Sequence, residues 1–117
     1  MTQKIEKMNL IVDRIITLGK DDSKPLSVIA LKLMEEVGEF AECLNFELGY
    51  LQHKVMKEPL IGEAADIIQV VLAILGKHYI EKSSAEIIEL LQEHLIKKTD
   101  KWESIVQWES VVALTNK

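Results

Sequence analysis

Two pairs of acidic residues in this chain have a spacing that suits a divalent metal ion. Glu36 and Glu39 form the first pair, and Glu63 and Asp66 form the second. Side chains three residues apart on a helix point about 60° apart on the same face, so each pair presents two carboxylates to one side. A ligand set of oxygens, with no cysteine or paired histidine, favours Mg²⁺ or Mn²⁺ over Zn²⁺. We therefore predict a magnesium site, which Mn²⁺ could also occupy.

The second pair lies in a strongly apolar segment. From Pro59 to Leu75 the only acidic residues are Glu63 and Asp66. A helix that is apolar nearly all round is buried, and a buried carboxylate is costly unless it is paired or binds a metal. The alternative is structural, because Glu-x-x-Glu is common on helices and acids near a helix start favour the macrodipole. The two pairs together favour the metal site.

A di-iron carboxylate bundle is the nearest competing metal site. Such bundles typically need Glu-x-x-His on two helices. In this chain the residues three positions before His53, His78 and His94 are Tyr50, Leu75 and Leu91. The spacing therefore disfavours iron.

The elements that must position these acids are all predicted to be helices. Apolar residues recur at three- and four-residue steps, without a run of alternating polar and apolar positions. The expected helices cover about 3–18 and 25–48, begin again at Pro59, and run from about Ser84 to beyond Trp102. The predicted fold class is all-α, a four-helix bundle with room for a short fifth segment near Trp108.

Glycines mark two of the expected helix ends. Gly19 and Gly49 fit the position just past a helix, where a left-handed backbone conformation favours glycine. Other small residues, Gly38, Ala64 and Ala65, flank the acidic pairs. We expect these three residues to let the two acidic helices approach closely.

Polar residues and a proline mark two of the expected helix starts. Asp22 or Ser23 is expected to cap the second helix, with Pro25 in its first turn. Ser83 and Glu86 form the Ser-x-x-Glu signature of a capping box, which predicts the start of the fourth helix.

The composition is typical of one globular domain covering residues 1–117. Apolar residues make up 48% of the chain and charged residues 28%, which is too apolar for a disordered protein. The net charge of −5 argues against a nucleic-acid polymer as partner. The most apolar stretch, 67–75, is far shorter than the roughly 20 residues that span a bilayer. Since Cys43 is the only cysteine, no internal disulfide is expected, and we predict a cytoplasmic protein with no membrane partner.

The acidic residues also form a motif that is found in a known family. Glu35-Glu36-x-x-Glu39 is followed, after residues 40–62, by Glu63-x-x-Asp66. This pattern, with the length and the helix order, resembles the MazG-like all-α nucleoside triphosphate pyrophosphatases, which are related to dimeric dUTPases and phosphoribosyl-ATP pyrophosphohydrolases. The resemblance covers most of the chain, from about Leu26 to Trp102.

The resemblance implies a function and a role for each acid. Mg²⁺ would be held by Glu36, Glu39, Glu63 and Asp66. The catalytic residues would be Glu35 and Glu39, with Glu35 as an auxiliary acid that orients the attacking water or a further ligand. The reaction would be hydrolysis of a nucleoside triphosphate to NMP or dNMP and pyrophosphate, an activity that suits the removal of non-standard nucleotides. The competing hypothesis is a non-catalytic helical protein that binds nucleotides or acts as an adaptor.

The resemblance also implies a phosphate-binding role for the last helix and self-association. Lys97 and Lys101, with His94 one turn earlier, would bind phosphate, and Trp102 would stack on the base. The alternatives are solvated lysines that favour the helix C-terminus and a tryptophan buried in the core. Residues 17–21 lack the aromatic and arginine residues often seen there in the family, so the base is not assigned. A homodimer or homotetramer is expected.

Overall fold

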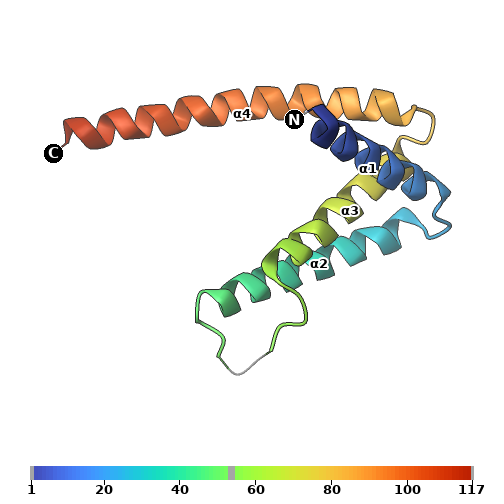
Figure 1. Cartoon of the computed structure of the whole chain (residues 1–117), viewed down its shortest axis with the longest axis horizontal. Coiled ribbons are helices and arrows are strands. Elements are labelled where there is room, and N and C mark those ends of the chain that lie inside the picture. The colour runs from blue at the N-terminus through green and yellow to red at the C-terminus, as the bar shows by residue number, and fades with distance from the viewer. Residues whose placement is uncertain (1, 53–54, 117) are drawn as a thin grey trace.

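The regular structure of the chain is helical. The computed structural model describes residues 2–52 and 55–116, and it contains four helices and no strand in those ranges. They are α1 (Thr2–Asp21), α2 (Leu26–Glu47), α3 (Leu60–His78) and α4 (Ser84–Thr115) (Figure 1). The prediction of an all-α fold of four helices is confirmed. The prediction of a short fifth segment near Trp108 is wrong. Residues 84–115 contain no glycine or proline, and α4 therefore continues unbroken.

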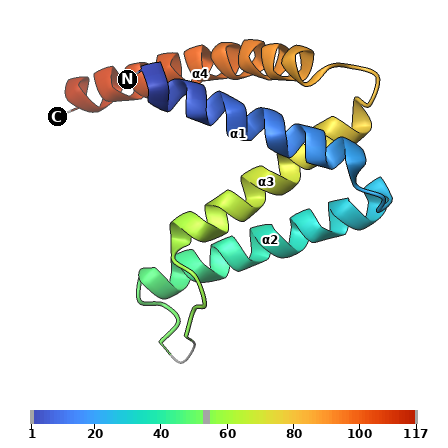
Figure 2. The ribbon, with the colours of Figure 1, turned by 45° about the vertical axis from the view of Figure 1, so that its right-hand side comes forward.

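The helices pack in the order α2, α3, α1, α4. α3 lies between α1 and α2, while α4 packs against α1 and one end of α3 (Figure 2). The small core sits where α1, α3 and α4 meet, around Ile16, Leu72 and Ile87, with Val12 and Leu75 packed against it. Among the described residues, α2 contacts α3 but neither α1 nor α4. One side of α2 is therefore without a partner in the single chain.

The start of α4 follows the sequence prediction. The Ser83 hydroxyl accepts a hydrogen bond from the Glu86 backbone amide at 3.1 Å, and the Glu86 carboxylate accepts one from the Ser83 amide at 3.2 Å. The capping box is confirmed.

The start of α2 differs from the prediction. Pro25 is the N-cap in an extended conformation and α2 begins at Leu26, without a side-chain cap. Asp22 instead accepts a hydrogen bond from the Lys24 amide at 2.8 Å, inside the connecting turn. The predicted cap by Asp22 or Ser23 is wrong because the proline restricts the residue before it to extended conformations and delays the helix.

Glycines act at helix contacts as well as at helix ends. Gly49 has a φ of 87° and follows α2 as predicted. Gly19 was expected to end the first helix but lies inside α1, where a Cβ atom would come within 2.3 Å of the Ala73 carbonyl oxygen of α3. Gly76 of α3 faces α1 in the same way, since its Cβ would lie 2.2 Å from the Ile16 carbonyl oxygen. The close helix approach is therefore between α1 and α3, whereas Gly38 is exposed with no atom near its Cβ position.

This contact predicts the sign of a stability change. Alanine in place of glycine normally stabilises a helix by about 1 kcal/mol. Gly19→Ala is expected instead to lower the free energy of unfolding by roughly 1–3 kcal/mol, because its methyl group would overlap the α3 backbone. Gly38→Ala is the matched control and should raise this free energy by about 0.5–1 kcal/mol. Equal stabilisation of the two variants in urea denaturation would contradict the packing described here.

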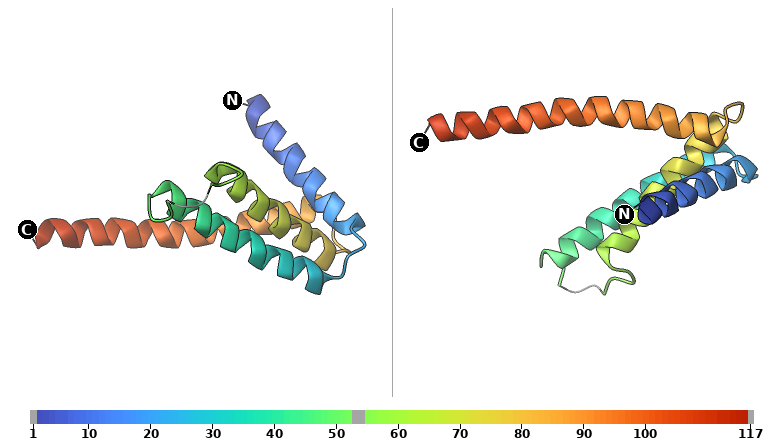
Figure 3. Two further views of the ribbon diagram at one scale, coloured as in Figure 1. Left: turned by 90° about the horizontal axis from the view of Figure 1, so that it is seen from below. Right: turned by 45° about the horizontal axis from the view of Figure 1, so that its top comes forward.

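The chain is extended because α4 runs beyond the other helices. Its C-terminal end extends beyond α1, α2 and α3 (Figures 1 and 3). The Cα radius of gyration is 18.1 Å, compared with roughly 13 Å for a compact domain of about 100 residues. None of the described helices is long and apolar enough to cross a membrane.

Candidate metal centre

The acidic side of α2 is the side that packs against α3. The buried residues of α2 are Ile29, Glu36 and Cys43, which follow one another at seven-residue steps and so share one face. The apolar stripe on the other side, with Met34 and Leu48, is exposed. The helix therefore turns a glutamate inward and leaves leucine and methionine outside.

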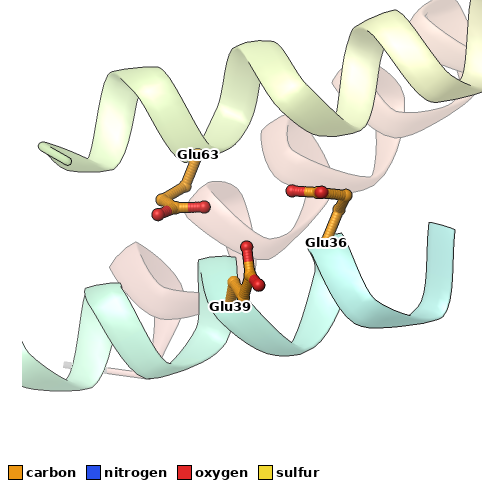
Figure 4. A group of neighbouring side chains, drawn as sticks. All are labelled: Glu36, Glu39 and Glu63. Carbon is orange, nitrogen blue, oxygen red and sulfur yellow. The ribbon is translucent and has the colours of Figure 1, made fainter. Parts of the chain in front are cut away.

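Three carboxylates meet between α2 and α3. Oxygen atoms of Glu36, Glu39 and Glu63 all lie within 4.8 Å of one another. Figure 4 shows Glu36 and Glu39 pointing from α2 toward Glu63 of α3. Glu36 is 5% exposed and Glu63 is 9% exposed, whereas Glu39 lies at the open edge of the cluster. The structure thus brings three of the four predicted metal ligands together.

The fourth predicted ligand belongs to a second, overlapping group. Asp66 lies with Glu58 and Glu63, and one oxygen from each of these three residues is within 4.8 Å of the others. Asp66 is half-buried and Glu58 is exposed. The four predicted acids are therefore divided between two groups that share Glu63.

Two buried oxygens of the first group lack a hydrogen-bond partner. They are Oε2 of Glu36 and Oε2 of Glu63, and neither is paired with any described residue. A buried carboxylate oxygen without a partner carries a large desolvation cost. A hard divalent cation would satisfy both oxygens, so the residues present fit Mg²⁺ or Mn²⁺.

Burial and neighbouring negative charges raise the pKa of two carboxyl groups in the cluster, Glu63 and Glu39. The pKa of Glu63 is raised, first by desolvation and then by the negative charges of Glu39, Glu58, Asp66 and Glu36. The pKa of Glu39 is raised as well, by desolvation and by Glu36 and Glu35. A bound cation would reverse both effects, because it favours the charged form of each acid.

Lys32 is a neighbour of the cluster that the sequence motif did not indicate. Its ammonium group is 3.0 Å from Glu36 and 3.5 Å from Glu35. The hydrogen bond to Glu36, followed by the charges of Glu35 and Glu36, raises the pKa of Lys32. The signal available in the sequence was its position three and four residues before these two acids, which places all three side chains on neighbouring helix positions. The ion pair with Lys32 thus places the exposed Glu35 next to Glu36 of the carboxylate cluster.

A cavity opens next to these residues. It has a volume of about 540 Å³, is lined by residues of α1, α2 and α3, and reaches Lys32 and Glu35. Most of its wall is apolar, including Leu18, Ile29 and Val70, and Gln69 adds a polar group. An apolar cavity with a few polar groups beside a metal candidate has the features of a small-molecule site.

The predicted phosphate-binding residues lie elsewhere in the single chain. Lys97, Lys101 and Trp102 are exposed on α4. His94 lines a separate cavity of about 220 Å³, with Leu75 and Leu91 among its neighbours. No described residue of α4 contacts α2, so one chain does not bring these residues to the carboxylates.

The arrangement has the oxygen ligands that suit a divalent cation, beside a cavity of the size that suits a small organic ligand. Such a cation can neutralise phosphate oxygens and position a water molecule. No protein-family model, curated protein or solved structure matches this chain. The candidate site therefore stands on its own geometry.

Proposed function

We propose that the chain is a magnesium-dependent nucleoside triphosphate pyrophosphohydrolase that releases a nucleoside monophosphate and pyrophosphate. The observation that carries this proposal is the pair of buried, unpartnered oxygens on Glu36 of α2 and Glu63 of α3, whose carboxylates lie in one group with that of Glu39. A bound divalent cation would offset the desolvation cost of burying these two oxygens. The resemblance of the Glu35 to Asp66 motif to the MazG-like family supplies the reaction class.

Each part of the site has a role in this reaction. Mg²⁺, when bound, would offset the charge of the phosphates and lower the pKa of a bound water. Glu36, Glu39 and Glu63 supply its oxygen ligands, and Asp66, the fourth predicted ligand, lies in the adjoining group that shares Glu63. Glu35 lies beside them and orients the attacking water, while Lys32 holds Glu35 and Glu36 in place through its ion pairs.

The adjoining cavity accounts for the nucleoside part of the substrate. Apolar walls suit a planar base, and the side-chain amide of Gln69 can donate and accept hydrogen bonds. Because Glu35 lines this cavity and also borders the carboxylates, a base in the cavity would place its phosphates toward the acids. The cavity therefore favours a nucleotide over inorganic phosphate alone.

A homodimer or homotetramer is part of the proposal. The chain exposes 9356 Å² of surface, whereas a folded monomer of 13.3 kDa is expected to expose about 6,500 Å². A second copy that covered this difference of about 2,900 Å² on each chain would make an interface of about 5,800 Å² in total, which is the size of a large permanent interface. A second copy accounts for this excess, since it carries the same open apolar faces.

The face that a second copy would cover continues the existing packing. Leu91 of α4 packs against the core, and the exposed Leu95, Trp102, Ile105 and Val106 follow on the same side of the helix. The exposed stripe of α2 also lacks a partner among the described residues. An α4 from a second copy would cover such a stripe, and the phosphate-binding role of Lys97 and Lys101 stays a prediction for the assembly.

Self-association should depend on Trp102. The wild type is expected to sediment as a dimer or tetramer, and Trp102→Glu should shift it toward monomer because the new charge would have to be buried. Gln107→Glu is the matched control, since Gln107 lies on the opposite side of α4 and is exposed. A stable wild-type species of 13.3 kDa would contradict this part of the proposal.

The activity is tested by pyrophosphate release. A panel of standard, deoxy- and modified-base nucleoside triphosphates is incubated with the protein, with and without Mg²⁺. The proposal expects at least one substrate to release pyrophosphate only when Mg²⁺ is present. Nucleotide binding without turnover across the panel would instead support the non-catalytic alternative.

A further inference from the structure

Lys32 connects the two parts of the candidate site. Its side chain lines the cavity of about 540 Å³, and its ammonium nitrogen lies 3.0 Å from Oε1 of Glu36 in the carboxylate cluster. Lys24 also lines the cavity, but its ammonium group lies 3.0 Å from Asp22, in the turn before α2. Lys32 is therefore the lysine that the fold places between the cavity and the carboxylates.

The length of the cavity suits a nucleoside that ends at Lys32. α2 lines the cavity from Val28 to Glu35, a rise of about 10 Å along the helix. Lys24 precedes α2 and belongs to the end of the cavity near the helix start, whereas Lys32 and Glu35 belong to the end that borders the carboxylates. A nucleoside that lies along the cavity with its base toward the helix start would present its first phosphate at Lys32.

The acids at this end of the cavity make a cation necessary there. Glu35 and Glu36 lie 3.5 Å and 3.0 Å from the Lys32 ammonium group, and two carboxylates alone would repel an approaching phosphate. Lys32 is the positive charge that the fold supplies at this point.

The ammonium group of Lys32 is free to reach a phosphate oxygen. Its side chain is 53% exposed, and an ammonium group has three donors on a flexible stem. Glu36 is also expected to hold the divalent cation, which would weaken its attraction for Lys32. A phosphate oxygen then accepts a charge-assisted hydrogen bond in place of the carboxylate.

We infer that Lys32 binds the phosphate next to the nucleoside, through a hydrogen bond from its ammonium group to an oxygen of that phosphate. The inference rests on the proposed function and assigns phosphate binding to α2 of the same chain. In the proposed reaction this phosphate is the one that loses pyrophosphate, so Lys32 would offset the charge that develops there. Since no described residue of α4 contacts α2, Lys97 and Lys101 do not take this role within one chain.

The test compares the affinity for a nucleoside with the affinity for its 5′-monophosphate. Isothermal titration in saturating Mg²⁺ measures the common ribonucleosides and their 5′-monophosphates, which lack the anhydride bond that the proposed reaction hydrolyses. The wild type is expected to bind the best monophosphate at least about 10-fold more tightly than its nucleoside. Lys32→Gln should lose most of this preference and bind the nucleoside as the wild type does, because glutamine carries no charge.

Two further variants show whether the position and the charge of the lysine both matter. Lys24→Gln removes the charge at the other end of the cavity and should keep the preference for the monophosphate. Lys32→Arg keeps a positive charge and hydrogen-bond donors, so it should retain most of the preference. Circular dichroism checks that all three variants keep the helical fold.

Binding of Mn²⁺ alone distinguishes phosphate binding from a purely positioning role. A lysine that only held Glu36 in place would be needed for metal binding, so its loss would weaken the affinity for Mn²⁺. The inference instead expects Lys32→Gln to bind Mn²⁺ at least as tightly as the wild type, because a positive charge beside the carboxylates has been removed. Weaker Mn²⁺ binding with an unchanged monophosphate preference would overturn the inference.

The outcomes also separate this inference from the proposed function. A monophosphate preference that survives in Lys32→Gln, or that the wild type lacks, overturns the inference, while pyrophosphate release by the wild type still supports the proposed function. Loss of the preference in Lys32→Gln without pyrophosphate release from any triphosphate supports phosphate binding by Lys32 and overturns the catalytic proposal.

Discussion

Glu39→Gln should lose pyrophosphate release by at least about 100-fold while keeping its helical fold. Glu39 lies at the open edge of the cluster, where its carboxylate faces both the buried acids and the solvent side. Glutamine has the same shape but offers a neutral oxygen, so it holds a divalent cation weakly. The fold should survive because the side chain is exposed.

The measurement compares initial rates of pyrophosphate release at saturating Mg²⁺ for the best substrate of the panel. Glu81→Gln is the matched control, because Glu81 lies in the exposed turn between α3 and α4, away from the acidic groups. Circular dichroism of both variants checks the helical content. Activity of Glu39→Gln within a few-fold of the wild type would remove Glu39 from the site.

The helices were predictable because they depend on local sequence. The three- and four-residue apolar steps, the capping box at Ser83 and the glycine at position 49 each act over a few residues, and all are seen in the structure. Gly19 was misplaced for a physical reason. Its sequence neighbours suggest a helix end, but its missing side chain is used in a contact with Ala73, fifty-four positions away. Tertiary contacts of this kind have no local signal.

The acids of the candidate site were predictable, but their grouping was not. A spacing of three residues fixes which acids share a helix face, so Glu36 with Glu39 and Glu63 with Asp66 followed from the sequence. How the two faces meet depends on the register of α2 against α3, and this register places Asp66 beside Glu58 and away from Glu36. Glu58 precedes the helix and has no periodicity, so spacing could not reveal it.

The partner of each helix face was also hidden in the sequence. Amphipathic spacing shows that a face is apolar, but it does not show which surface covers it. The spacing of the α2 stripe with Met34 and Leu48 predicts a core face, but the stripe is exposed in the single chain. In our proposal a second copy covers this stripe. The sequence of one chain does not show which surface of the second copy does so.

Glu63→Gln is expected to change stability in opposite directions with and without metal. In the metal-free protein the raised pKa of Glu63 means that the folded state binds a proton more tightly than the unfolded state. Such an acid contributes stability that is present below its unfolded pKa of about 4.3 and is lost as the pH rises through its folded pKa. Once the pH is above that folded pKa, the charged Glu63 therefore opposes folding, and glutamine removes that charge.

The expected result is a crossing of melting temperatures. Without metal at pH 8, Glu63→Gln should melt several degrees above the wild type, and this gap should close as the pH falls toward 5. Acids with lowered pKa values, such as Asp22 and Glu86, lose stability in the same acidic range. These acids are present in both proteins, so the difference between wild type and variant isolates Glu63.

Adding Mg²⁺ should reverse the order. At a concentration about 100 times its Kd, a ligand that binds only the folded state contributes about 2.7 kcal/mol, which raises the melting temperature of a domain this size by on the order of 10 °C. The wild type should show this rise, whereas Glu63→Gln, which lacks the carboxylate common to both groups, should show almost none. Glu81→Gln should follow the wild type under all conditions. If Glu63→Gln is less stable than the wild type without metal and its melting temperature still rises with Mg²⁺, Glu63 is a structural acid. In that case the carboxylate cluster is not a metal site.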